Sequence, residues 1–199
     1  MSDAAATPPP RLSRDAFYAW AMDQPRGRFE LLDGQVVAMA PERVAHARAK
    51  GAAWLALREA VAAAGVACEA LPDGVTVEIG DATCYEPDVV VACGEIPGDV
   101  LAVPSPLVVV EVTSPSNSRI DLVTKFADYF RLPSLRHYVI VHLALRRVIH
   151  HRRTEDGRIE SAILTDGQLV LHPPGISVPV EALFGPKPRG AAAGTPAGP

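Results

Sequence analysis

Leu107-Val108-Val109-Val110-Glu111-Val112 is an unbroken apolar run that contains a single acid. Apolar residues that do not alternate with polar ones are typical of a strand covered on both faces. The run therefore predicts the central strand of a sheet. Shorter strands are predicted on either side of it, at 66–71, 75–79, 88–93, 137–142, 145–153, 159–164 and 168–171. The last two are expected to extend the same sheet edge.

Helical patterns and one hairpin complete the predicted fold. Residues 13–22 form a short amphipathic helix after the cap residue Ser13, and Asp33-Gly34 between two apolar runs indicates a hairpin turn. A long helix is predicted over 41–64, and another over 117–131. The apolar stripe of that second helix is expected at Ile120, Val123, Ala127 and Phe130. The fold class is α/β (α+β): a mixed central sheet flanked by helices, with an N-terminal hairpin and C-terminal antiparallel strands.

The composition is that of one globular domain. The chain has 199 residues, of which 48% are hydrophobic and 21% charged. Both ends are rich in Pro, Gly or Ala, so residues 1–10 and 185–199 are expected to be disordered tails around a folded domain at 11–184. The net charge of −4 indicates that any nucleic-acid contact must come from a local basic patch.

The sequence also excludes several classes. It has no apolar run near the roughly 20 residues that a membrane-spanning helix needs, and its N-terminus lacks the apolar segment of a signal peptide. A cytoplasmic protein with no membrane partner is expected. The three cysteines are not in CxxC spacing and are predicted to be reduced thiols.

Two acids stand in runs that otherwise predict buried strands. Asp88 precedes Val89-Val90-Val91, and Glu111 lies inside the central run. A buried carboxylate is costly unless it is paired, hydrogen-bonded or bound to a cation. On neighbouring strands the two could share a hard cation, and oxygen ligands suit Mg²⁺. Each acid could instead only end its strand and cap the following turn.

Lys125 is the third candidate. On the predicted helix it lies opposite the apolar stripe, with Asp121 one turn earlier. It could form an exposed pair with Asp121, or it could reach over the end of the Glu111 strand and stabilise charge on a phosphate.

These motifs together resemble a known family. The stretches Tyr85-Glu86-Pro87-Asp88, Glu111-Val112-Thr113-Ser114 and Lys125-xxx-Tyr129, with the hairpin Phe29–Gly34, are similar to the Uma family of restriction-endonuclease-like proteins. The resemblance covers about residues 13–155. That family belongs to the PD-(D/E)XK nuclease superfamily.

The resemblance implies a Mg²⁺-dependent phosphodiesterase site, with Mn²⁺ as a substitute. Asp88 and Glu111 match the two motif acids and would hold the metal, Glu30 looks like an additional acidic metal ligand, and Lys125 matches a catalytic lysine displaced onto the helix. The lysine expected two residues after Glu111 is Thr113 here. Where the family often carries an acid, this chain has His142, to which no role is given.

Three basic residues are candidate substrate contacts. His46 stands near the start of the long helix, where it is either part of a solvated polar face or a phosphate contact. Arg146 and Arg147 belong to a basic hairpin that could track phosphates or merely protect a sheet edge.

The expected function is that of a cytoplasmic, metal-dependent endonuclease acting on DNA, with a homodimer as one expected state of association. A catalytically inactive nuclease-fold module that binds nucleic acid or protein is the alternative. A structural partner in a larger assembly is a third reading.

Overall fold

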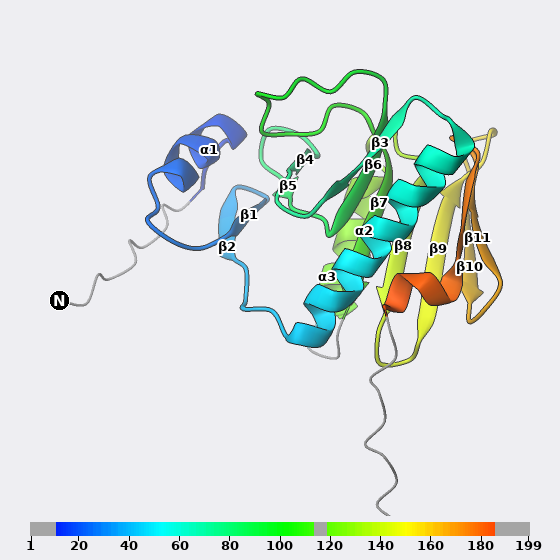
Figure 1. Cartoon of the computed structure of the whole chain (residues 1–199). Helices are drawn as coiled ribbons and strands as arrows, with labels where there is room; N and C mark the ends of the chain where they lie inside the picture. The colour runs from blue at the N-terminus through cyan, green and yellow to red at the C-terminus, as the bar shows by residue number, and fades with distance from the viewer. Residues whose placement is uncertain (1–10, 114–118, 186–199) are drawn as a thin grey trace, which may run out of the picture.

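The structure, a computed structural model, describes residues 11–113 and 119–185 (Figure 1). Its centre is a six-stranded mixed sheet in the order β10-β9-β8-β7-β6-β3. These strands are β3 (Cys68–Pro72), β6 (Val89–Cys93), β7 (Pro106–Thr113), β8 (His137–His142), β9 (Arg147–Arg153) and β10 (Ile159–Leu164). Only the β7–β8 pair is parallel, because α3 (Arg119–Tyr129) returns the chain to the start of β8. The mixed sheet flanked by helices confirms the predicted fold class.

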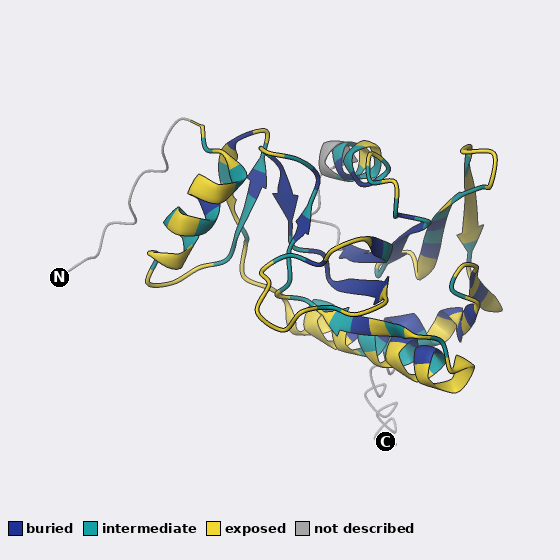
Figure 2. Cartoon of the chain, turned by 90° about the horizontal axis from the view of Figure 1, so that it is seen from above, coloured by how far each residue is buried: buried dark blue, intermediate teal, exposed yellow. Residues whose placement is uncertain are grey.

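Two helices cover opposite faces of this sheet, as the view from above shows (Figure 2). The long helix α2 (Val44–Ala64) packs on one face through Ala49, Ala53, Leu57 and Val61. Helix α3 packs on the other face, where Tyr129 contacts the aromatic ring of Tyr138. The valines of β6 and β7 alternate between these two cores, which explains why they form continuous apolar runs.

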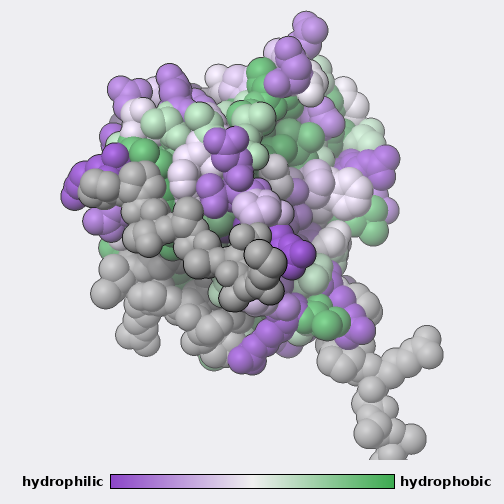
Figure 3. All heavy atoms as spheres, turned by 90° about the vertical axis from the view of Figure 1, so that its left-hand side faces the viewer, coloured by the Kyte–Doolittle hydropathy of each residue, from purple (hydrophilic) through white to green (hydrophobic). Residues whose placement is uncertain are grey.

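The N-terminal elements form a second, smaller sheet with the order β2-β1-β5-β4. Its strands are β1 (Phe29–Leu32), β2 (Gln35–Ala38), β4 (Val77–Glu78) and β5 (Cys84–Tyr85). Asp33 and Gly34 both have positive φ, at 47° and 79°, which is the geometry of the predicted two-residue turn. Helix α1 (Arg14–Met22) begins after Ser13, whose side chain accepts a hydrogen bond from the Ala16 amide at 3.4 Å. On the side of the molecule that carries α1, β1 and β2, hydrophilic and hydrophobic residues are mixed (Figure 3).

The C-terminal strands depart from the sequence prediction. β10 pairs with β9 in the main sheet, as expected. β11 (Gln168–Leu171) does not join it and forms a separate two-stranded sheet with β12 (Ile176–Pro179). The short 3₁₀ helix η1 (Val180–Phe184) then packs against α2. The apolar side of this unit belongs to the α2 core, so burial against the helix decides its placement.

The cysteine prediction was wrong for two of the three residues. Cys68 and Cys93 form a disulfide between β3 and β6, and only Cys84 is a free thiol. The two half-cystines are direct partners in the antiparallel register, with their Cα atoms 3.8 Å apart. Strand pairing brings them together across 25 residues, so their spacing in the sequence carries no sign of the bond.

Two histidines lie inside the β8–β9 pair. Nδ1 of His137 is 2.9 Å from Nε2 of His150, and Nε2 of His137 is 2.9 Å from the Pro173 carbonyl. Burial lowers the pKa of both side chains to about 4. The hydrogen bond between the rings requires one donor and one acceptor, which a doubly protonated pair cannot provide.

We expect acid to destabilise the fold through this pair. Each folded-state pKa lies below the usual value of about 6.5. The contribution of this pair to the free energy of unfolding is therefore fully present above pH 6.5 and is lost as the pH falls toward 4. The unfolding free energy from urea titrations at several pH values should fall by a few kcal/mol over this window. The double variant His137→Phe/His150→Leu should show a much smaller fall, and His142→Gln should behave like the wild type. A wild-type stability that stays constant from pH 7 to 4.5 contradicts this role.

Candidate functional site

The two motif acids stand side by side on neighbouring strands. β6 and β7 are antiparallel, with Val89 opposite Val110, which puts Asp88 beside Glu111. The Asp88 amide donates to the Val110 carbonyl at 3.1 Å, and Oδ2 of Asp88 accepts from the Val112 amide at 2.5 Å. Asp88 is therefore fixed by its backbone and its side chain to the strand that carries Glu111.

Helix α2 supplies the cations around Asp88. Nζ of Lys50 is 3.1 Å from Oδ1, and Nε2 of His46 is 3.6 Å from Oδ2. Burial disfavours the ionised carboxyl, but His46, Lys50 and the Val112 amide outweigh burial and lower the pKa of Asp88. Nε2 of His46 is itself buried without a hydrogen-bond partner in the described part of the chain.

Helix α3 supplies the partners of Glu111. Its Oε1 accepts from Nζ of Lys125 at 3.1 Å and from the Tyr129 hydroxyl at 2.8 Å. Burial raises the pKa of Glu111 to about 7; Lys125 opposes this shift, whereas the charges of Asp88 and Glu30 add to it. The two acids are thus close enough to interact electrostatically. Burial and Glu111 raise the pKa of Tyr129 well above its usual value, so Tyr129 stays a donor.

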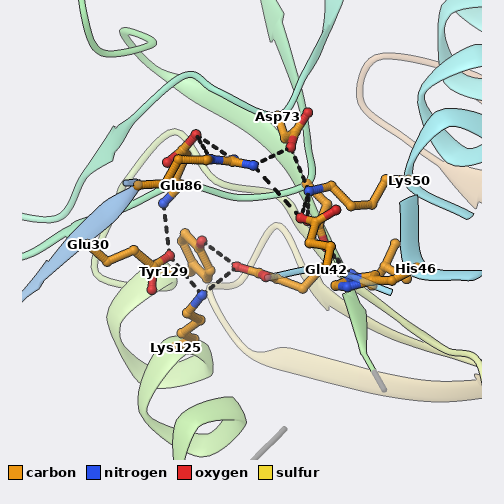
Figure 4. A network of polar contacts seen from close by, with 12 residues as sticks. Glu30, Glu42, His46, Lys50, Asp73, Glu86, Lys125 and Tyr129 are labelled. Carbon is orange, nitrogen blue, oxygen red and sulfur yellow. Dashed lines mark hydrogen bonds and ion pairs between the residues drawn. The ribbon is translucent and has the colours of Figure 1, made fainter. Parts of the chain in front are cut away.

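Glu30 reaches the same cluster from the N-terminal sheet. Its Oε1 lies 3.0 Å from Nζ of Lys125 and accepts from the Glu86 amide at 3.0 Å (Figure 4). Lys125 therefore bridges Glu30 and Glu111, which lie 81 positions apart in the sequence. The hairpin is the element that brings Glu30 to the site.

The predicted orientation of α3 was wrong. Val123 was expected in the buried stripe but is 68% exposed, whereas Lys125, expected on the opposite side, is only 6% exposed. The face that meets the sheet carries Leu122, Lys125, Phe126 and Tyr129. The hydrophobic pattern does not predict that this lysine is buried, because its carboxylate partners come from other elements. Ile120 and Asp121 lie outside the residues whose side chains are described.

Lys50 is the main site residue that sequence reasoning missed. It is 6% exposed and contacts Glu42, Asp73 at 2.6 Å and Asp88 at 3.1 Å (Figure 4). The Arg28 guanidinium extends this network, because its nitrogens lie 2.8 Å from Oδ2 of Asp73 and 2.5 Å from Oε1 of Glu86. One signal was available: Lys50 stands one helical turn after His46, so both residues face the same side of α2.

The basic hairpin lies near the same end of the sheet. Thr113 pairs with His142 on β8, and His142 pairs with Arg147 on β9. Arg146 and Arg147 are exposed, and the Arg146 guanidinium lies 4.6 Å from the centre of the Phe184 ring. The hydroxyl of Thr113, which stands two residues after Glu111 where a lysine was expected, is buried without a hydrogen-bond partner in the described segments. Neither arginine forms a described ion pair with the acids.

The donor set suits a magnesium ion held by few protein ligands. Within residues 11–113 and 119–185, no three acidic, histidine or cysteine side chains are grouped closely enough to hold a metal. Mg²⁺ is usually bound by one or two carboxylates, with waters and substrate phosphate completing an octahedron. Asp88 and Glu111 fit that requirement, and Glu30, which comes from the N-terminal sheet, is joined to Glu111 through Lys125.

Comparison with known proteins gives the family and a similar fold. The family model Uma2, described as "Putative restriction endonuclease", matches residues 14–181. A solved structure with a similar fold is that of a "putative nuclease belonging to DUF820" from Anabaena variabilis ATCC 29413. Its TM-score is 0.70 at 14% identity, over 87% of this chain and 97% of that one, a likeness that shows the fold. No curated protein matches the chain. No helix among the described residues is long and apolar enough to cross a membrane.

Proposed function

The chain belongs to the Uma2 family, and on this basis we propose that it is a Mg²⁺-dependent nuclease that hydrolyses phosphodiester bonds in DNA. The observation that carries the proposal is the pair of buried acids on adjacent strands, Asp88 and Glu111, each held against a buried lysine. Buried charge of this kind stabilises a fold poorly compared with apolar packing, which favours a functional reason for it.

Each residue has a distinct proposed role. Asp88 and Glu111 would hold the metal, which when bound would activate a water and offset charge on the scissile phosphate. Lys125 places an ammonium beside Glu111 and would stabilise the charge that develops on the phosphate. Glu30 and Tyr129 orient Lys125 and Glu111, respectively, through the contacts described above. We therefore propose Glu30 as a positioning residue rather than a metal ligand.

The DNA surface is proposed to include His46, Arg146 and Arg147. Arg147 lies two strands away from Thr113, at about 5 Å per strand, and both arginines are exposed. His46 places a buried ring nitrogen 3.6 Å from the Asp88 carboxylate. Positive side chains at these places would contact phosphates on either side of the scissile bond.

The alternative function is a catalytically inactive module that binds nucleic acid or protein. Two observations favour it. Thr113 stands in place of the expected lysine, and each acid already pairs with an ammonium group, whose positive charge would repel a bound metal ion. Both candidates are compatible with DNA binding, so metal dependence separates them.

Metal-linked stability gives the first test. At ten times the dissociation constant, Mg²⁺ or Mn²⁺ should raise the melting temperature by about 3–6 °C, the shift expected for a ligand that binds only the folded state. Asp88→Asn keeps the acceptor for the Val112 amide but removes the charge, and it should lose this shift. Asp99→Ala, at an exposed acid, is the matched control. Nicking of plasmid DNA should follow the same order, and a wild type that shows neither shift nor nicking would leave the inactive module as the function.

A further inference from the structure

A cavity of about 320 Å³ opens beside Asp88 on the α2 side, and the proposed cleavage chemistry does not use it. Its wall includes Asp88 itself, Asp73, Lys50 and Trp54. The volume is at the small end of the roughly 300–1,000 Å³ typical of ligand pockets. It therefore has room for one planar ring system and not for a stack of base pairs.

The charges around the cavity do not suit a phosphate. Lys50 is the one cation among the described lining residues, and its ammonium already contacts Glu42, Asp73 and Asp88. An ammonium has three donors, so these three carboxylates engage all of them. Arg28 also contacts Oε1 of Glu42 and Oδ2 of Asp73, the same oxygens that Lys50 contacts. What remains for a ligand is the second oxygen of each of these carboxylates, which accepts hydrogen bonds from N–H groups and repels anions.

Trp54 gives the cavity an aromatic wall. The indole is half-buried, and its Nε1 donates to the Ala70 carbonyl at 2.9 Å, which fixes the orientation of the ring. The Arg58 guanidinium lies 5.5 Å from the ring centre, so the indole already has one planar group over its ring. A fixed, partly exposed aromatic ring is the usual platform on which proteins stack an unpaired base.

Gly51 is an exposed residue of the cavity wall. It stands in the middle of α2, where glycine is less stable than alanine by roughly 0.5–1 kcal/mol. A Cβ added at this position would meet no described atom within 4 Å, so close packing within the described chain does not require the glycine. Gly51 nevertheless lines the cavity, and a larger side chain there would project into free space beside it.

We propose that this cavity is a nucleobase subsite, which takes an unpaired base next to the phosphodiester held at Asp88. The base stacks on Trp54, and its amino hydrogens face the carboxylates of Glu42 and Asp73. This inference rests on the proposed nuclease function. A base inside a duplex is paired and stacked, so the subsite requires single-stranded DNA or an extruded base. Bases with an exocyclic amino group should be preferred over thymine.

Filling the cavity tests the subsite. Gly51→Leu is the test variant, and Ala63→Leu, exposed on the same helix about 18 Å away along its axis, is the matched control. With a single-stranded oligonucleotide, Gly51→Leu should lower kcat/KM roughly 5- to 150-fold, the range for one lost stacking contact. An oligonucleotide that carries an abasic residue beside the cleaved bond should be cut equally by Gly51→Leu and the wild type. Melting temperatures check that both variants fold.

A binding measurement separates this subsite from the cleavage reaction. In a Trp20→Phe background Trp54 is the remaining tryptophan, and dCMP should quench its fluorescence more strongly than TMP does. Gly51→Leu should abolish the difference. If the wild type cuts DNA but dCMP leaves Trp54 unquenched and Gly51→Leu cuts normally, the subsite is overturned and the nuclease function stands. If dCMP quenches as expected while no DNA is cut, the subsite stands and the nuclease function fails.

Discussion

Replacement of Glu111 by glutamine should reduce metal-dependent DNA cleavage to background. The amide keeps the shape of the side chain and can still accept from the Tyr129 hydroxyl, but it no longer carries the charge that attracts a divalent cation. Replacing a residue that hydrogen-bonds to a metal ligand typically lowers metal affinity or activity about 10–100-fold, and replacing a ligand itself should lower activity further. Metal-free stability should stay close to that of the wild type, because burial already raises the pKa of Glu111 to about 7 and Lys125 keeps its ion pair with Glu30.

The measurement is a plasmid-nicking assay with Mg²⁺ or Mn²⁺ beside thermal melts of the same preparations. Glu155→Gln, which neutralises an exposed acid far from β7 in the sequence, is the control and should cut like the wild type. If Glu111 only stabilises the strand end, Glu111→Gln will instead lower the melting temperature and leave the metal dependence of nicking intact. That result would remove Glu111 from the proposed metal site.

Lys125→Met should have the largest effect on stability. The methionine removes the ammonium that bridges Glu30 and Glu111 and leaves two carboxylates, both mostly buried, without it. Breaking one partner out of a buried ion pair typically costs about 3–5 kcal/mol. For a chain of this size the melting temperature should fall by roughly 6–20 °C. Cleavage should be lost as well, because the cation proposed to stabilise the phosphate is gone.

A second substitution distinguishes this mechanism from a general packing defect. Adding Glu111→Gln to Lys125→Met removes one of the stranded charges, and the double variant should recover a large part of the lost stability without recovering cleavage. Val123→Met, on the exposed side of the same helix, is the control for the substitution itself. An exposed lysine, as the sequence pattern suggested, would give a Lys125→Met protein that melts like the wild type.

Local patterns in the sequence were sufficient for most of the framework. The apolar run around Val109 predicted a doubly covered strand, Asp33-Gly34 predicted the hairpin, and the helical pattern over 41–64 predicted the end of α2, which is followed by Gly65 with φ of 63°. Each of these features depends on neighbours within a few residues, either through backbone conformation or through the alternation of buried side chains. For the same reason Asp88 and Glu111, as acids inside apolar strands, could be singled out before their partners were known.

What only the tertiary structure decided is which charges meet. Lys125 is joined to Glu30 from another sheet, Lys50 is joined to Asp73 and Asp88, and Cys68 is joined to Cys93. A buried lysine looks like a surface residue in any hydrophobic pattern, because the pattern records apolarity and not the carboxylates that other elements bring to it. The sequence by itself therefore predicted most of the strands and turns and singled out the two acids. The cations that neutralise those acids, and the face that α3 turns to the sheet, follow from long-range contacts that local spacing does not encode.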